Sequence, residues 1–240
     1  MYVQTSFISS SVLSQQVLST ILLVIISPLP SLLFLLHPSM KNQVLTNSTT
    51  TQLGSATTQN GLTAGGGCKA MTVIFARGTT EQGNVGSLSG PPWFDAMAQM
   101  VGAENLAVQG VDYPANVQGF LAGGDKKGSA KMAQLVQQAM TACPDTQVVM
   151  AGYSQGGQLV HNAAAMLPAA TAAKVSSAVI FGDPMNGKPV AGVSAAKTKI
   201  ICHNGDKICD GQNQVLQPHL TYSQNADEAA QFAAGAAGLA

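Results

Sequence analysis

A glycine-flanked serine between a strand and a helix constrains this chain more than any other feature. An apolar run at 147–150 precedes it, a helix-type run at 158–166 follows it, and the motif reads Gly152-Tyr153-Ser154-Gln155-Gly156. Gly-x-Ser-x-Gly at a strand-to-helix junction is typical of the nucleophile elbow of α/β serine hydrolases. The turn is so sharp that the residues two before and two after the serine crowd each other, so glycine is needed there. The sequence therefore predicts a serine at the carboxyl end of a strand, with a helix N-terminus that stabilises negative charge behind it.

The overall charge narrows the classes of partner. The chain has 240 residues, which suffices for one domain and a tail, and its 11 basic and 11 acidic residues balance. Only 9% of residues are charged, and there is no basic patch or acidic run. Because binding to nucleic acid depends on clustered basic side chains, we expect no nucleic-acid partner.

The N-terminal part differs from the rest in composition. Residues 1–40 have no charged side chain, and their two apolar runs, 17–26 and 32–36, are interrupted by Pro28 and Pro30. This favours a hydrophobic export signal or an over-extended N-terminus over an uncleaved membrane anchor. We therefore expect a secreted, extracellular protein without a stable membrane partner after processing. Residues 41–67 are rich in Ser, Thr and Gly, predict a disordered linker, and include a glycosylation acceptor at Asn47.

The cysteines agree with export. There are four, and their spacing is not that of a zinc site. We expect no metal and no cofactor. An even number in an exported chain indicates two disulfides, for which three pairings are possible. Cys202 and Cys209 lie close in sequence, which favours one bridge between them and a second between Cys68 and Cys143.

Residues 68–240 are predicted to be the catalytic domain. Apolar runs rich in β-branched residues, as in strands buried on both faces, occur at 71–76, 106–111, 147–150, 177–181 and 198–202. Helix-type segments start at Pro92, span 129–141 and close the chain at 227–237. This alternation predicts an α/β fold, a three-layer α/β/α sandwich with a five-stranded parallel sheet. No connection is long enough for a large lid, so we expect a small lidless hydrolase with an open site. We also expect a monomer.

The serine needs a base to take its proton, and four histidines are available. His37 lies in the export segment, and His161 follows Ser154 by two helical turns on the same helix, too far to reach back. His219 lies in a loop between the last strand and the final helix, where an α/β hydrolase has its base. His203 adjoins a strand end, and its acid would have to follow it. His219 is the favoured base.

The acid that orients the base must lie between Ser154 and His219. Asp183 and Asp206 each follow a predicted strand, and Asp210 trails Cys209. Asp206 lies in the short segment between Cys202 and Cys209 that a disulfide would lock, which suits an orienting role. Asp183 precedes a proline and is interpreted as a turn residue. Asp206 is the favoured acid.

Five motifs in order between Cys68 and Tyr222 make the chain resemble the cutinases. They are Ala76-Arg77-Gly78-Thr79-Thr80-Glu81, Cys143-Pro144-Asp145, Gly152-Tyr153-Ser154-Gln155-Gly156, Cys202-x-x-Gly205-Asp206-x-x-Cys209-x-Gly211 and Pro218-His219-Leu220-x-Tyr222. The resemblance implies Ser154 as nucleophile, Asp206 as acid and His219 as base. It implies Thr79, where the family usually has serine, and Gln155 as oxyanion-hole residues, and the same two disulfides.

The resemblance also implies the substrate class. Cutinases hydrolyse hydroxy fatty acid esters of cutin, so a polymeric or small ester is the expected partner. An apolar lip beside the site is expected from Val117, Phe120, Leu121, Val215, Leu216 and Leu220. Two features depart from the cutinases: the run 212–214 is polar where cutinases tend to be apolar, and the stretch 182–186 resembles the acetylxylan esterases more than the cutin-cleaving enzymes. An acetylxylan esterase or other short-chain esterase is therefore the alternative. A second alternative is a secreted non-catalytic effector on the same scaffold, although the candidate serine, histidine and aspartate are all present.

Overall fold

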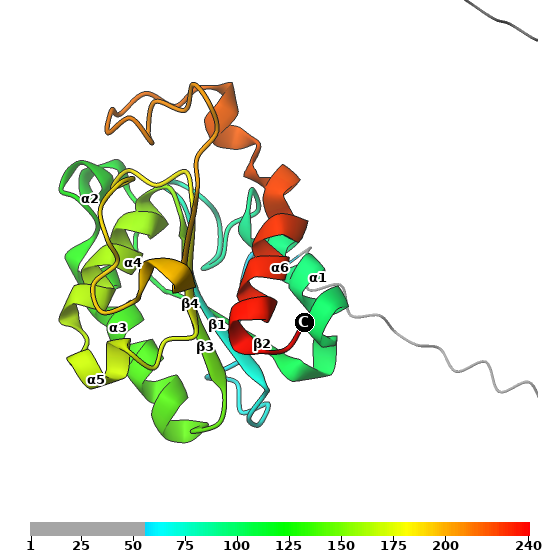
Figure 1. The fold of residues 1–240 in the computed structure, drawn as a ribbon. Helices are drawn as coiled ribbons and strands as arrows, with labels where there is room; N and C mark the ends of the chain where they lie inside the picture. Colours follow the sequence, from blue (N-terminus) through cyan, green and yellow to red (C-terminus); the bar gives the residue numbers. More distant parts are fainter. Residues whose placement is uncertain (1–55) are drawn as a thin grey trace, which may run out of the picture. The chain divides into compact units, whose positions relative to one another are not determined.

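Five parallel strands form the single sheet found in residues 56–240, the part of the chain that the computed structural model describes (Figure 1). Their order across the sheet is β2-β1-β3-β4-β5. The strands are β1 (Met71–Ala76), β2 (Leu106–Gly110), β3 (Gln147–Tyr153), β4 (Ser177–Phe181) and β5 (Thr198–Ile201). Each coincides with a run of apolar residues in the sequence, and the five-stranded α/β prediction is confirmed.

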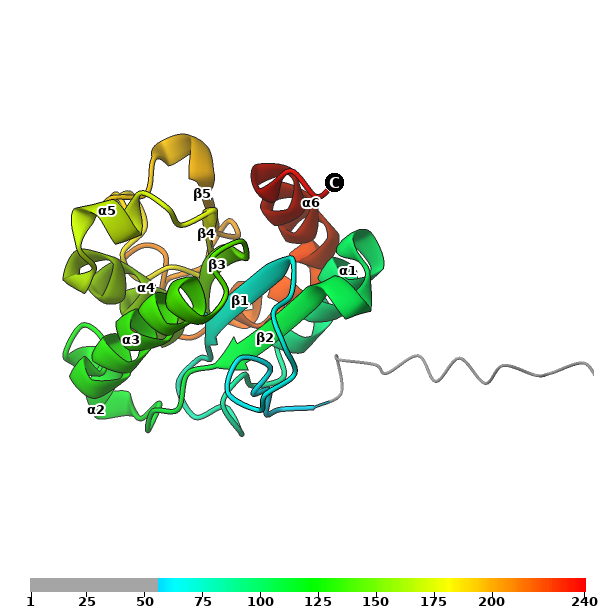
Figure 2. The same ribbon diagram turned by 90° about the horizontal axis from the view of Figure 1, so that it is seen from below.

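Helices cover both faces of the sheet. The longer ones are α1 (Gly90–Val101), α3 (Lys126–Ala142), α4 (Gln155–Met166) and α6 (Ala226–Ala237). Shorter ones are α2 (Val117–Leu121), α5 (Ala169–Ala172) and the 3-10 turns Ala103–Asn105, Ala195–Lys197, Gln217–Leu220 and Tyr222–Asn225. Figure 2 shows α1 and α6 together on one side of the sheet and α3 and α4 on the other.

The strands of the sheet are buried on both faces, and their sequences reflect this. Successive side chains of a strand point to opposite faces, so a strand between two helical layers must be apolar throughout. In β1, Val73 and Phe75 join the core beneath α1 and α6, whereas Ile74 joins the core beneath α3 and α4. In β4, Phe181 and Ile180 divide in the same way. This explains why the strand sequences show no polar alternation.

The predicted disordered linker does not hold for its described C-terminal part. The Gly61 N–H donates to the Val108 carbonyl at 2.7 Å, and Asn60 forms an antiparallel bridge with Gln109. The Thr57 carbonyl accepts from the N–H groups of Asn84 and Val85. This segment covers the outer edge of β2, where an exposed strand would leave unpaired backbone groups. Backbone pairing, to which a polar composition gives no clue, decides its structure.

The predictions for the N-terminal region concern residues outside the described part. These are the export segment 1–40, the linker as far as residue 55, His37 and the acceptor at Asn47. Among the helices of residues 56–240, none has the length and hydropathy that a membrane span requires.

Two disulfides join the four cysteines in the favoured pairing. Cys68, before β1, is bonded to Cys143, at the end of α3, and Cys202 is bonded to Cys209. The first bridge spans 75 positions of the sequence and the second spans 7. The long bridge ties the first strand to the helix that covers it, and the short one closes a surface loop.

We expect these bridges to contribute unequally to stability. In the chain-entropy model, removing the Cys68–Cys143 bridge lowers the free energy of unfolding by about 4.5 kcal/mol. Removing the Cys202–Cys209 bridge, which closes a much shorter loop, lowers it by about 2.5 kcal/mol. Denaturant unfolding of the two double serine variants, Cys68→Ser with Cys143→Ser and Cys202→Ser with Cys209→Ser, measures both. An equal loss, or a larger one at the short loop, would contradict this order.

Candidate active site

Ser154 lies on a strained turn between β3 and α4. Its backbone has φ 56° and ψ −120°, a conformation that L residues rarely adopt. A Cβ at Gly152 would lie 2.3 Å from the Gly156 carbonyl oxygen, and one at Gly156 would lie 1.9 Å from the Ala76 oxygen. Both glycines are therefore sterically required, as the sequence pattern predicts. The turn leaves the Ser154 side chain at the carboxyl edge of the sheet, beside the first turn of α4.

The structure brings together the three residues that the sequence predicted to act with one another. The Ser154 Oγ is 2.9 Å from Nε2 of His219, and the Nδ1 of His219 is 2.8 Å from Oδ2 of Asp206. A carboxylate can only accept, so Nδ1 carries the proton and Nε2 is free to accept from the serine hydroxyl. Asp206 and His219 are each 1% exposed, and the chain of hydrogen bonds is shielded from bulk water.

Asp206 is held inside the loop closed by Cys202 and Cys209. Its Oδ1 accepts from the Ile208 N–H at 3.0 Å, and its Oδ2 accepts from the Tyr222 hydroxyl at 2.6 Å as well as from His219. Burial acts to raise the pKa of Asp206, but the hydrogen bonds from Tyr222, His219 and Ile208 and the charge of His219 outweigh it. The net result is a pKa below the ordinary value. Asp206 is therefore a buried carboxylate that stays ionised.

Thr79 and Gln155 lie side by side next to the serine. The side-chain amide of Gln155 donates to Thr79 Oγ1 at 2.8 Å and to the Asn116 carbonyl at 2.9 Å. Since Thr79 Oγ1 accepts this bond, its own proton is free for another acceptor. Gln155 is also the first residue of α4, so its backbone N–H has no acceptor within the helix. Unused donors thus gather beside Ser154.

The other two described histidines have different surroundings. His161 is buried on α4, and its Nε2 is 2.9 Å from Oδ2 of Asp183. The other carboxylate oxygen, Oδ1, accepts from the Met185 N–H. The interpretation of Asp183 as a turn residue captures the second bond but not the buried histidine partner. The ring nitrogens of His203 face the Pro218 carbonyl and Asn225 Oδ1 at 2.8 and 2.7 Å. Neither histidine is hydrogen-bonded to Ser154.

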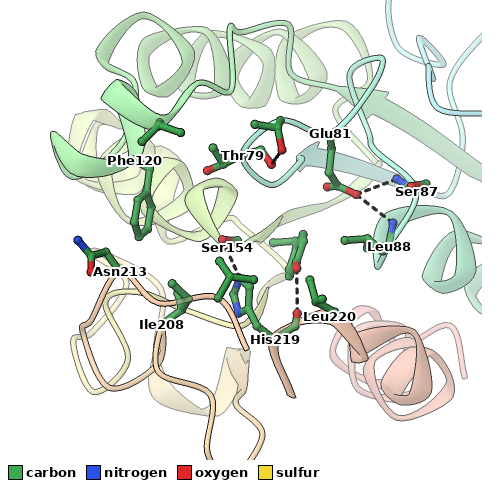
Figure 3. Close-up of a pocket in the computed structure, with 14 residues that line it drawn as sticks. Thr79, Glu81, Ser87, Leu88, Phe120, Ser154, Ile208, Asn213, His219 and Leu220 are labelled. Atoms are coloured by element: carbon green, nitrogen blue, oxygen red, sulfur yellow. Dashed lines mark hydrogen bonds between the residues drawn. The ribbon is translucent and has the colours of Figure 1, made fainter. Parts of the chain in front are cut away.

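A cavity of about 500 Å³ opens above Ser154 and His219 (Figure 3). Four of the six predicted lip residues line it, namely Val117, Phe120, Val215 and Leu220. Leu121 and Leu216 do not line it and are exposed at the surface. Asn213, from the polar run, lies at the rim. The cavity lining is mainly apolar, and polar side chains are spread along it from Asn213 through Ser154 and Thr79 to Glu81 and Ser87.

Sequence reasoning assigned no role to several residues of the site. Tyr153 donates from its hydroxyl to the His219 carbonyl at 2.8 Å and stacks on the His219 ring. Glu81 accepts from the backbone N–H groups of Gly78, Ser87 and Leu88, and so shapes the loop that contains Thr79. Tyr153 and Glu81 lie inside the sequence motifs on which the resemblance to cutinases rests. Their position in those motifs is the signal that could have identified them. No cluster of His, Cys, Asp or Glu in residues 56–240 is arranged to hold a metal ion.

The lowered pKa of Asp206 has a consequence for stability against pH. A carboxylate with a lowered folded-state pKa contributes stability that is fully present above its unfolded pKa of about 3.9 and is lost as the pH falls through the folded value. We expect Asp206→Asn to lower the unfolding free energy at pH 5, and the difference from the wild type to shrink between about pH 4 and pH 2. Denaturant unfolding across that range measures it. A difference that stays constant down to pH 2 would contradict the lowered pKa.

Comparison with known proteins identifies relatives of this chain. The family model described as Cutinase matches residues 67–237. Cutinase pbc1 of Pyrenopeziza brassicae is 59% identical over 71% of this chain and 84% of its own length. A cutinase of Botryotinia fuckeliana is 58% identical over 72% of this chain and 85% of its own length.

Solved structures show the same relationship. The Trichoderma reesei cutinase in complex with a C11Y4 phosphonate inhibitor is 47% identical, covers 76% of this chain and 80% of its own chain, and has a TM-score of 0.71. The catalytic core of a Trichoderma reesei acetyl xylan esterase, at 24% identity and a TM-score of 0.53 over 70% of this chain and 98% of its own, shares the fold. With a family model across most of the chain and relatives identical at more than half of the aligned positions, this chain belongs to the cutinase family of carboxylic ester hydrolases.

Proposed function

We propose that this protein is a secreted serine esterase that cleaves cutin-type aliphatic polyester through an acyl-enzyme. The observation that carries the proposal is the hydrogen-bonded series Ser154–His219–Asp206 on the floor of an apolar cavity. A hydroxyl is a weak nucleophile until a base takes its proton, and a base works best when a third group fixes its tautomer. Here the base and the orienting carboxylate are both in hydrogen-bonding contact.

In the first step, Ser154 Oγ attacks the ester carbonyl carbon while its proton passes to His219 Nε2. Asp206 keeps the Nδ1 proton in place and stabilises the imidazolium that forms. The tetrahedral intermediate then collapses, and the Nε2 proton goes to the departing alcohol oxygen. Water repeats the sequence on the acyl-enzyme, with His219 again as base, and the carboxylic acid is released with Ser154 restored.

Negative charge on the tetrahedral intermediate needs donors that are already in position. We assign this role to the backbone N–H groups of Thr79 and Gln155 and to the Thr79 hydroxyl. The Gln155 side chain donates to Thr79 Oγ1. Because the threonine oxygen accepts this bond, its own proton points away from Gln155 and is available to another acceptor. A donor fixed before the reaction costs no reorganisation when charge develops, which is why such donors accelerate acyl transfer.

The cavity supports an acyl chain longer than acetyl. Val117, Phe120, Ile208, Val215 and Leu220 all line it. Each buried methylene contributes about 0.8 kcal/mol, so an aliphatic acyl chain gains binding free energy along this wall. Asn213 adds a polar side chain among these apolar ones. These features favour a short to medium aliphatic ester, in line with the cutinases among the relatives.

Secretion rests on the cysteines. All four are joined in disulfides, and no cysteine of the described residues is free. Disulfides form and persist in oxidising compartments and are rare in the cytosol. An extracellular enzyme also meets a polymeric plant ester directly, as the proposed function requires.

Two buried histidine–aspartate pairs allow a matched test of the triad. His219→Gln should lower kcat for a soluble p-nitrophenyl ester by about 10⁶-fold, since losing the base alone costs about as much as losing the whole triad. His161→Gln alters an equally buried pair that does not reach Ser154, so its turnover should stay within about threefold of the wild type. Ser154→Ala should abolish both hydrolysis and labelling by a phosphonate ester. Turnover by folded Ser154→Ala protein would refute the assignment.

Acyl length separates the substrate classes. We expect kcat/KM for p-nitrophenyl esters to be higher at C4 than at C16, because polar side chains such as Asn213, Glu81 and Ser87 interrupt the apolar lining of the cavity. It should also be higher at C4 than at C2, because additional methylenes bury apolar area. A rate profile from C2 to C16 measures this, with release of hydroxy fatty acids from cutin as the second readout. A maximum at C2, with acetylated xylan cleaved and cutin untouched, would instead identify an acetylxylan esterase.

A further inference from the structure

We propose that Tyr222 is a positioning residue for the reaction, fixing the Asp206 carboxylate against His219 through its hydroxyl. The inference deepens the proposed function and rests on it. Tyr222 does not line the cavity, and its side chain is 1% exposed. Its hydroxyl donates to Asp206 Oδ2 at 2.6 Å, the same oxygen that accepts from His219 Nδ1 at 2.8 Å.

The direction of this hydrogen bond follows from the donors around it. The backbone N–H of His203 lies 3.0 Å from the Tyr222 oxygen, and an N–H can only donate. The tyrosine oxygen therefore accepts from His203, and its own proton goes to a different neighbour. Asp206 Oδ2 is the acceptor at hydrogen-bonding distance, while the Cys209 sulfur, at 3.7 Å, belongs to a disulfide and is a weak acceptor. The series therefore runs from His203 through Tyr222 to Asp206.

The charges are consistent with this direction. Burial, followed by the hydrogen bond to the Asp206 carboxylate, raises the pKa of Tyr222, so the phenol remains a neutral donor. Among the hydrogen bonds that lower the pKa of Asp206, the one from Tyr222 contributes most. Two donors on one carboxylate oxygen share its negative charge, so Tyr222 sets how strongly that oxygen attracts the His219 proton.

The ring of Tyr222 is held on several sides. It stacks on the His203 ring with centroids 4.2 Å apart and packs at a tilt against Phe181 at 6.3 Å. His203 is itself tied to the Pro218 carbonyl, one residue before His219, and to Asn225. The same group of side chains thus fixes Tyr222, Asp206 and the segment that contains His219.

Tyr222→Phe tests the hydroxyl while the ring remains. We expect kcat for p-nitrophenyl butyrate to fall about ten- to hundredfold, the scale on which partners one step removed from a functional group act. KM should stay within about twofold, because Tyr222 does not touch the cavity. The NMR resonance of the His219 Nδ1 proton should move downfield, because Asp206 Oδ2 loses its competing donor and binds that proton more tightly.

Tyr113→Phe is the matched control, because Tyr113, like Tyr222, is a buried tyrosine whose hydroxyl donates a hydrogen bond. The acceptor of the Tyr113 hydroxyl is the backbone carbonyl of Arg77. Tyr113 contacts neither Asp206 nor His219, so the substitution should lower the melting temperature without moving the Nδ1 resonance. Wild-type kcat and an unmoved resonance in folded Tyr222→Phe would overturn the proposal. If the wild type itself hydrolysed no ester, the proposed function would fail instead, and the resonance would still report on the Tyr222 bond.

Neutron diffraction of deuterated wild-type protein examines the same bond without any substitution, so the test does not depend on a variant that folds. We expect the deuterium on the Tyr222 oxygen to point at Asp206 Oδ2 and that on the His203 nitrogen to point at the tyrosine oxygen. A tyrosine deuterium directed at the Cys209 sulfur would overturn the proposal.

Discussion

The close backbone approach around Ser154 is the constraint on which the site depends. Gly156 comes so near Ala76 at the end of β1, and Gly152 so near Gly156, that no side chain fits at either glycine. The first turn of α4 therefore packs directly against the end of β1, and Ser154 adopts a positive φ. The same approach places the N-terminus of α4 beside the loop that contains Thr79, to which Gln155 is hydrogen-bonded. One turn therefore positions the serine and the donors around it.

The other half of the site is built without regular secondary structure. Asp206 and His219 lie in the connection between β5 and α6, where no helix or strand fixes the backbone apart from short 3-10 turns. The chain compensates with covalent and polar contacts. The Cys202–Cys209 bridge closes the Asp206 loop, Tyr153 holds the His219 carbonyl, and Tyr222 holds the Asp206 carboxylate. The proposed role of Asp206 in orienting His219 would require such support, because small displacements in an active site lower turnover.

A second buried histidine–aspartate pair lies in the same domain, so burial and pairing alone do not distinguish the candidate site. His161 and Asp183 are as close as His219 and Asp206 and are similarly buried. His161, however, projects from α4 two turns beyond Ser154, and its partner oxygen faces the helix rather than the cavity lining. What separates the pairs is that His219 contacts the Ser154 hydroxyl beneath an accessible cavity, whereas His161 does not.

The sequence by itself determined the five strands, the elbow, the pairing of elements into an α/β sandwich and the identities of Ser154, Asp206 and His219 as residues that meet. It could do so because buried parallel strands must be apolar throughout, and the elbow must have glycines at fixed positions. Only the tertiary structure decided which lip residues face the cavity, that residues 57–61 cover the edge of β2, and that Asp183 pairs with His161. Each of these features depends on contacts between segments that are distant in sequence. Local composition does not show which distant residue will hydrogen-bond to a polar side chain or pack against an apolar one.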